Sequence, residues 1–180
     1  MSTRDRGSAD ISPAASDFID SLLAAWRTSN RITVSVIRQL PDALWAAGIP
    51  GVPRKTIRGL GSHLHNTRCM WLKTLGKPLG IAVPAPVDRN AASRREVAVA
   101  LGRSSDAMEA LLRLGCAQGG RVPATPAYVW RNLALDVAHV LTYFVAHEAH
   151  HRGQIVMAAR QLGMRLPSAV TSGMWWWKPR

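Results

Sequence analysis

Four stretches of the chain repeat apolar residues at the spacing of an α-helix. In the first stretch the apolar positions recur mostly three or four residues apart: Phe18, Leu22, Leu23, Trp26, Ile32, Val36, Ile37 and Leu40. Ser12 and Pro13 are typical of a helix start, because the hydroxyl can cap free backbone N–H groups and proline lacks only an N–H that would be unpaired there. Since Pro41 ends the pattern, we predict a first helix from Ser12 to about Leu40.

The same periodicity predicts three further helices, over about residues 56–75, 93–114 and 128–163. Gly76-Lys77-Pro78 stops the second of them. Ser93 and Glu96 match a capping box, in which each side chain bonds an exposed N–H of the other residue at a helix start. Glycine and proline fill the connections at 41–54, 78–90 and 115–127, with a short turn expected at 42–47.

No stretch alternates with the period of a strand, so the predicted fold class is all-α, a four-helix bundle with long crossover connections. We expect a disordered N-terminal tail at residues 1–11, the bundle at 12–166 and a tryptophan-rich C-terminal tail at 167–180. Trp175 to Trp177 in that tail are expected to pack against the bundle or a partner subunit, as large aromatic side chains tend to be buried.

Length and composition fit one folded domain. The chain has 180 residues, of which 47% are hydrophobic and 19% charged. Cys69 and Cys116 are too few for a disulfide framework, and they predict free thiols in a reducing cytosol. The N-terminal residues lack an apolar signal segment, and no uncharged run is long enough to cross a membrane. We therefore expect a soluble, cytoplasmic protein.

The net charge of +12 favours anionic partners. Nucleic acid is the obvious class, but the arginines are spread from Arg4 to Arg180 without a long basic run or a known reader motif, so DNA binding is the weaker interpretation. An anionic small molecule is favoured instead. Only three glutamates accompany six histidines, which disfavours carboxylate-rich metal sites and favours an imidazole site.

Four of the six histidines lie in the last predicted helix. At about 100° per residue, His147 and His151 fall within its apolar stripe, whereas His139 and His150 fall on one flank. Two histidines four residues apart can bind one metal ion, although they can also simply form hydrogen bonds across helices. The segment 147–151 also matches the HExxH pattern of zinc proteases. That short pattern arises often by chance, and a protease is the weaker interpretation.

A third ligand has to come from another helix, and the second one offers His63 and His65. Residues two apart point to nearly opposite sides of a helix, so both cannot bind the same ion. The apolar face of this helix is centred about 100° from either histidine. Periodicity alone therefore leaves His63 and His65 equal.

Two segments carry a resemblance to a known family. The sequence HLHNTRCMWL at 63–72 and the sequence HEAHHRGQI at 147–155 resemble the DinB-like superfamily of bacterial damage-inducible proteins, and the likeness extends from the first helix through Leu162. This resemblance implies a DinB-like four-helix bundle, commonly a homodimer, that holds a divalent metal with three histidines. By position it implies His63, His147 and His151 as ligands, with His65 as the fallback.

The resemblance also implies a function in stress or damage responses. Zn²⁺, Ni²⁺ or Fe²⁺ would suit three imidazoles and leave a coordination position open. Characterised relatives use low-molecular-weight thiols in transfers or isomerisations, which implies a metal-dependent thiol S-transferase or isomerase. Arg68 and Arg152 are the first candidates to bind an anionic substrate, since they lie next to the histidine segments. A metal-binding stress protein without turnover is the alternative.

Overall fold

The computed structural model describes residues 13–129 and 132–178, and within them it confirms the all-α fold. The π-helical turn η1 (Leu72–Gly76) extends α3, and the 3₁₀ turn η2 (Lys77–Leu79) follows it. The α-helices are α1 (Pro13–Gln39), α2 (Asp42–Ala46), α3 (Ile57–Trp71), α4 (Arg94–Ala117), α5 (Val137–Gln161) and α6 (Ser168–Gly173). The predicted tail at 1–11 and the cap at Ser12 lie outside the described residues.

Side-chain caps fix where three of the long helices begin. Thr56 Oγ1 accepts a hydrogen bond from the Gly59 N–H (2.9 Å) at the start of α3. The predicted capping box between Ser93 and Glu96 is present at the start of α4. At the start of α5, the Asp136 carboxylate accepts from the N–H of His139 (3.0 Å). These caps satisfy N–H groups that the first helical turn leaves free.

The predicted start of the last long helix, near Tyr128, is wrong. Helix α5 begins at Val137, because the residues before it pair with the end of the preceding loop instead. The Leu135 carbonyl accepts from the Val122 N–H (2.7 Å), and the Val137 N–H donates to the Gly120 carbonyl (2.8 Å). Helical periodicity did not reveal these pairings, which join the two ends of the connection between α4 and α5.

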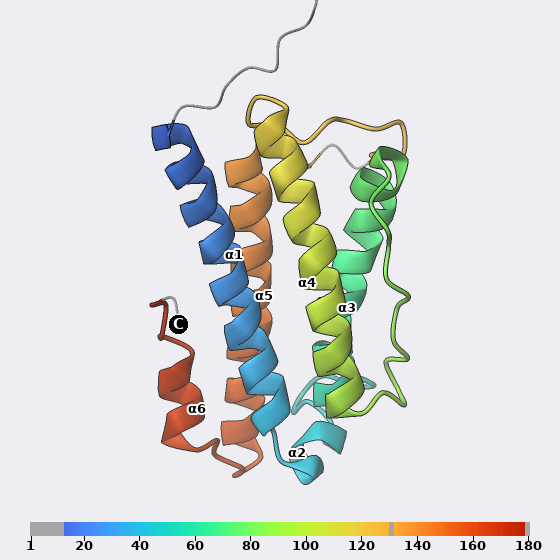
Figure 1. Cartoon of the computed structure of the whole chain (residues 1–180). Helices are drawn as coiled ribbons and strands as arrows, with labels where there is room; N and C mark the ends of the chain where they lie inside the picture. Colours follow the sequence, from blue (N-terminus) through green and yellow to red (C-terminus); the bar gives the residue numbers. More distant parts are fainter. Residues whose placement is uncertain (1–12, 130–131, 179–180) are drawn as a thin grey trace, which may run out of the picture.

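The four long helices lie side by side in Figure 1, with α4 beside α1 and α3, and they enclose two hydrophobic clusters. One cluster surrounds Trp45, Leu64 and Ile155. The other surrounds Trp26 and Phe144, whose ring centroids are 6.2 Å apart. A layer of buried polar side chains occupies the intervening turns of the helices: Ser29, Thr33, Arg68, Ser104, Glu148 and Arg152.

Arg68 is the centre of this polar layer and is completely buried. Its Nε donates to Oε1 of Glu148 on α5 (2.7 Å), and its Nη2 lies 2.6 Å from the same oxygen. Its Nη1 donates to Asn30 on α1 (2.9 Å) and to the Leu101 carbonyl on α4 (2.8 Å). The guanidinium group also lies 4.7 Å from the Trp26 ring centroid, within the range of a cation–π contact. One side chain on α3 thus bonds the other three long helices.

The long connection predicted between the second and third long helices is present as residues 80–93, an extended crossover that runs beside α3 and α4 (Figure 1). Two side chains of α3 hold it. The Asn66 amide donates to the Val87 carbonyl and accepts from the Val87 N–H, both at 2.9 Å. His65 Nε2 donates to the Ala85 carbonyl (3.0 Å). The crossover therefore has a defined path despite its lack of secondary structure.

In the C-terminal segment, helix α6 packs against α1, and its Val170 is buried. After α6 the chain is held by its backbone, since Arg31 donates to the Trp176 carbonyl (2.8 Å). Trp175, Trp176 and Trp177 are 80%, 60% and 40% exposed, so the bundle does not bury them, and packing against a partner subunit stays a prediction. Within the described part of the chain, every helix is too short or too polar to cross a membrane.

We expect Glu148→Gln to lower the free energy of unfolding by about 3–5 kcal/mol, because the substitution leaves the buried Arg68 charge without its carboxylate. Urea unfolding followed by circular dichroism measures this change. Glu109→Gln is the matched control. Glu109 pairs at the surface with Arg27 and Arg113, so its loss is expected to cost about 1 kcal/mol or less. Equal effects of the two substitutions would contradict the central role of the buried pair.

Candidate metal centre

The structure brings His63 of α3 together with His147 and His151 of α5. His147 and His151 lie one turn apart, with ring centroids separated by 4.6 Å. The His63 ring lies 5.3 Å from the ring of His147 and 4.8 Å from that of His151. One nitrogen from each residue can be chosen so that all three lie within 4.8 Å of one another. Three histidines from two helices thus form a group that could hold a metal ion.

The donor atoms fit a metal ion in spacing. The Nε2 atoms of His147 and His151 are 3.2 Å apart. Two nitrogens bound to one tetrahedral Zn²⁺ at its usual bond length lie about 3.3 Å apart, so this pair needs little adjustment. The other ring nitrogen of His151, Nδ1, donates to Gln154 Oε1 (2.7 Å). The proton is then on Nδ1, so Nε2 carries the lone pair that can bind a metal. Each ring is only partly exposed, which limits the water around the site.

Burial also keeps these imidazoles neutral. Desolvation, together with the neighbouring histidines, lowers the pKa of His63 and of His147 from 6.5 to about 4. Desolvation lowers the pKa of His151 as well, and the hydrogen bond that His151 donates to Gln154 opposes this lowering. Lys55 and Arg89 add to the lowering at His63. A neutral imidazole is the form that binds a metal, so the free site is ready for an ion near neutral pH.

The other three histidines are not part of this group, although the ring of His150 lies 5.2 Å from that of His151. His65 is fully buried on the other side of α3, where Nδ1 lies 3.0 Å from Ser104 Oγ, which removes it as the alternative to His63. His139 is exposed and pairs with Asp136 (2.6 Å). His150 is exposed on the flank of α5, as predicted. Cys69, beside His65, is buried, and burial raises the pKa of its thiol to about 11, so it stays protonated.

Glu148, Arg68 and Arg152 lie in the core and not beside the histidines. The Glu148 carboxylate accepts from Arg68 and from Thr33 Oγ1 (2.8 Å), and it faces away from a position where it could act as the general base of an HExxH protease. Arg152 is also buried and donates to Thr33 Oγ1 (2.7 Å). Neither arginine lines the cavities beside the histidines. Both arginines therefore make contacts inside the core, where Arg68 bonds Glu148 and Arg152 bonds Thr33.

A cavity of about 460 Å³ borders His63 and His151, and cationic side chains line part of the rest of its wall. Arg54 and Lys55 come from the loop before α3, and Arg89 comes from the crossover. Arg54 has a φ of 63°, which is uncommon for a residue other than glycine and is often found at functional sites. The sequence analysis missed these three residues. Their only signal was their position in the glycine- and proline-bearing connections next to the histidine helices.

A second cavity, of about 350 Å³, adjoins the first at Lys55, Leu60 and His151. Its wall is largely apolar and includes Val52 and Met157, which are 39% and 55% exposed. His151 therefore lies between a cationic cavity and an apolar one. Such an arrangement can hold two different chemical groups on either side of one ion.

Comparison with known families agrees with the histidine geometry. The model of the DinB family matches residues 14–179, a region that contains all three clustered histidines and all six helices except for the first residue of α1. No significantly similar protein is found among curated proteins. The resemblance predicted from the segments around His63 and His147 is confirmed.

We expect His63→Ala, His147→Ala and His151→Ala each to reduce the bound divalent metal to less than about a tenth of one ion per subunit, since each removes one of three ligands. Elemental analysis of the purified protein measures the metal content. His139→Ala is the control and is expected to keep the wild-type content, because its side chain lies at the other end of α5. Unchanged metal content in the three ligand variants would place the site elsewhere.

The metal-free protein is expected to lose stability as the pH falls from about 6.5 to about 4. Over this range the unfolded histidines take up protons, whereas His63 and His147 stay neutral in the folded state until the pH reaches about 4. Their contribution is therefore full above pH 6.5 and is lost as the pH falls. Urea unfolding at several pH values measures the slope. His63→Asn should flatten it, and a slope as steep as that of wild type would contradict the assignment.

Proposed function

This chain belongs to the DinB family, and from that premise we propose that it binds a divalent metal and acts as a metal-dependent enzyme on a low-molecular-weight thiol. His63, His147 and His151 are the proposed ligands. The reaction class is an S-transfer or an isomerisation. The homodimer, the cytoplasmic location and the role in stress responses, which the family resemblance implies, stay predictions.

The observation that carries the proposal is the opening of the three-histidine group onto two cavities. In the described part of the chain no fourth Cys, His, Asp or Glu joins the group. A site with three protein ligands keeps a position for substrate, whereas a purely structural site is closed by a fourth. Zn²⁺, Ni²⁺ or Fe²⁺ would supply Lewis acidity there, lowering the pKa of a bound thiol.

The cationic cavity supports an anionic thiol as one substrate. Arg54, Lys55 and Arg89 line the same cavity as His63 and His151, so a thiol at the histidines can place its carboxylates against these cations. A guanidinium group binds a carboxylate with two parallel hydrogen bonds, which fixes orientation as well as position. Arg68 and Arg152 are not part of this proposal, because their contacts lie in the core.

The adjoining apolar cavity supports an apolar electrophile as the second substrate. Val52 and Met157 leave apolar surface exposed on its wall, and binding an apolar group would remove that surface from water. The shared position of His151 brings this group beside the thiol. Held in this way, the two reactants meet without a search through solution.

We expect the purified protein to conjugate a thiol such as glutathione, mycothiol or bacillithiol to chlorodinitrobenzene. In this reaction a carbon–sulfur bond forms, chloride leaves with its electron pair, and the thiol proton passes to water. A chelator is expected to remove at least nine tenths of the rate, and an added divalent ion to restore it. Product absorbance measures the rate. Arg89→Gln should raise the KM for the thiol severalfold with kcat within twofold, since Arg89 lines the cavity and is not a ligand.

Arg121→Gln is the matched control, because Arg121 is exposed and lies outside the cavity. It is expected to leave both kinetic constants unchanged. The enzyme proposal is overturned if the protein holds one metal ion per subunit but shows no chelator-sensitive turnover with any of the three thiols. That result would support a metal-binding protein without catalytic activity.

A further inference from the structure

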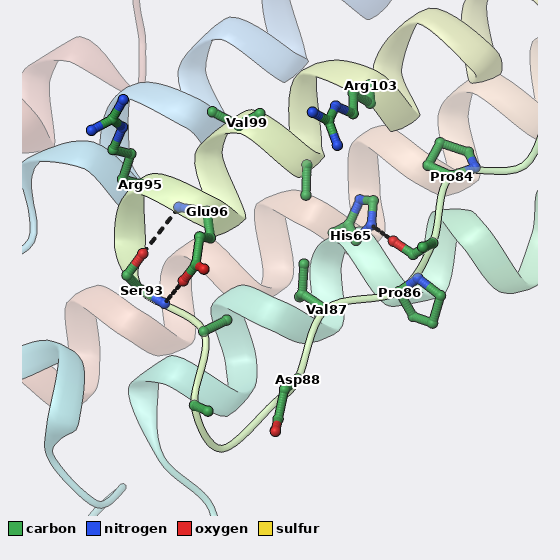
Figure 2. A pocket seen from close by; sticks show the side chains of 14 residues that line it. His65, Pro84, Pro86, Val87, Asp88, Ser93, Arg95, Glu96, Val99 and Arg103 are labelled. Carbon is green, nitrogen blue, oxygen red and sulfur yellow. Dashed lines mark hydrogen bonds between the residues drawn. The ribbon is translucent and has the colours of Figure 1, made fainter.

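A cavity of about 820 Å³ lies on the other side of α3 from the histidine centre. It is formed between crossover residues 84–92 and the first turns of α4, with His65 at its inner end (Figure 2). It shares no lining residue with the cavity beside His63 and His151. Nothing in the proposed metal chemistry uses this space, which has the volume of a typical small-molecule site.

The walls of the cavity are fixed by hydrogen bonds. On one side, the Asn66 amide holds both backbone groups of Val87, and His65 bonds the Ala85 carbonyl. On the other side is the regular helix α4. Because the walls are already held in place, binding a ligand costs little conformational entropy of the protein, which favours affinity.

The interior surface is largely apolar. Two prolines of the crossover and Val87 form one wall, and Val99 with Ala100 forms the other: Pro84, Pro86, Val87, Ala92, Val99 and Ala100. Val99 is a large apolar side chain that is 44% exposed on an otherwise amphipathic helix. An apolar ligand body would cover this surface.

Four charged residues line the cavity, two carboxylates and two guanidinium groups, and each carboxylate accepts a hydrogen bond from a backbone N–H. Glu96 Oε2 accepts from the Ser93 N–H (2.7 Å) in the capping box. Asp88 Oδ1 accepts from the Asn90 N–H (2.7 Å). Arg95 and Arg103, by contrast, form no ion pair with any residue in the ranges 13–129 and 132–178. Both are exposed, and in Figure 2 they lie on either side of Val99.

We propose that this cavity binds a small amphipathic organic anion, with its apolar body against Val87 and Val99 and its acidic group at Arg95 or Arg103. The two arginines and Val99 are spaced four residues apart, so they share one face of α4 over about 12 Å. That span suits one ligand with an acidic group near either arginine. The proposal needs no metal and stands independently of the histidine centre.

The test uses two fluorescent probes with the same apolar body, anilinonaphthalene sulfonate and its neutral analogue N-phenylnaphthylamine, titrated against the metal-free full chain. We expect the wild type to bind the sulfonate more tightly. Arg95→Gln combined with Arg103→Gln should weaken sulfonate binding at least fivefold and leave binding of the neutral probe within twofold. The charge-matched control combines Arg113→Gln with Arg121→Gln, removes the same two charges outside the cavity, and should change neither affinity.

Val99→Glu is the second variant and places a negative charge between the two arginines at an exposed position of α4. It should also weaken sulfonate binding at least fivefold. Sulfonate affinity that is absent from the wild type, or unchanged in both cavity variants, overturns the proposal. An equal loss in the charge-matched control also overturns it, because general attraction to the chain's positive charge then explains the binding.

Discussion

The buried ion pair between Arg68 and Glu148 joins the two helices that carry the candidate ligands. Arg68 lies five residues after His63 on α3, and Glu148 directly follows His147 on α5. An uncompensated charge in the core costs far more than a misplaced apolar contact, so α3 cannot slide along α5 without separating the pair. Contacts from Asn30 on α1 and Leu101 on α4 extend the constraint to all four long helices. The register that satisfies the buried charge also places His63 opposite His147 and His151.

On α5 the buried polar residues and the candidate metal ligands lie on faces about 100° apart. Glu148 and Arg152 face the polar layer of the core. His147 and His151, each one residue earlier, face His63 of α3, and His151 borders both cavities. This offset explains why the HExxH pattern here does not make a protease site: its glutamate is committed to Arg68. It also explains why the histidines are only half-buried. Burial keeps them neutral near pH 7, and their partial exposure leaves them accessible to an ion.

Local periodicity and capping predicted most of the fold, because helix starts such as Ser93 and stops such as Gly76 act within a few residues. The predicted start of α5 was wrong because Leu135 pairs with Val122, at the other end of the same connection, instead of continuing the helix. The choice between His63 and His65 required the family resemblance, since both lie equally far from the apolar face. Arg68 was predicted to bind substrate because it lies next to the histidine segment of α3. Its partner Glu148 is 80 residues away in the sequence, and no local pattern reveals that the two side chains are in contact.

The crossover links the two sides of α3. Residues 84–88 line the cavity next to Arg95 and Arg103, and the next two residues, Arg89 and Asn90, line the cavity next to the histidines. Asn66 holds Val87, near the end of the first stretch, so any change in the path of the crossover has to break two hydrogen bonds with α3. A long connection without regular structure is costly in conformational entropy unless something fixes it. Here the same fixed segment supplies one wall to each of two cavities, which accounts for its length better than the simple need to join two helices.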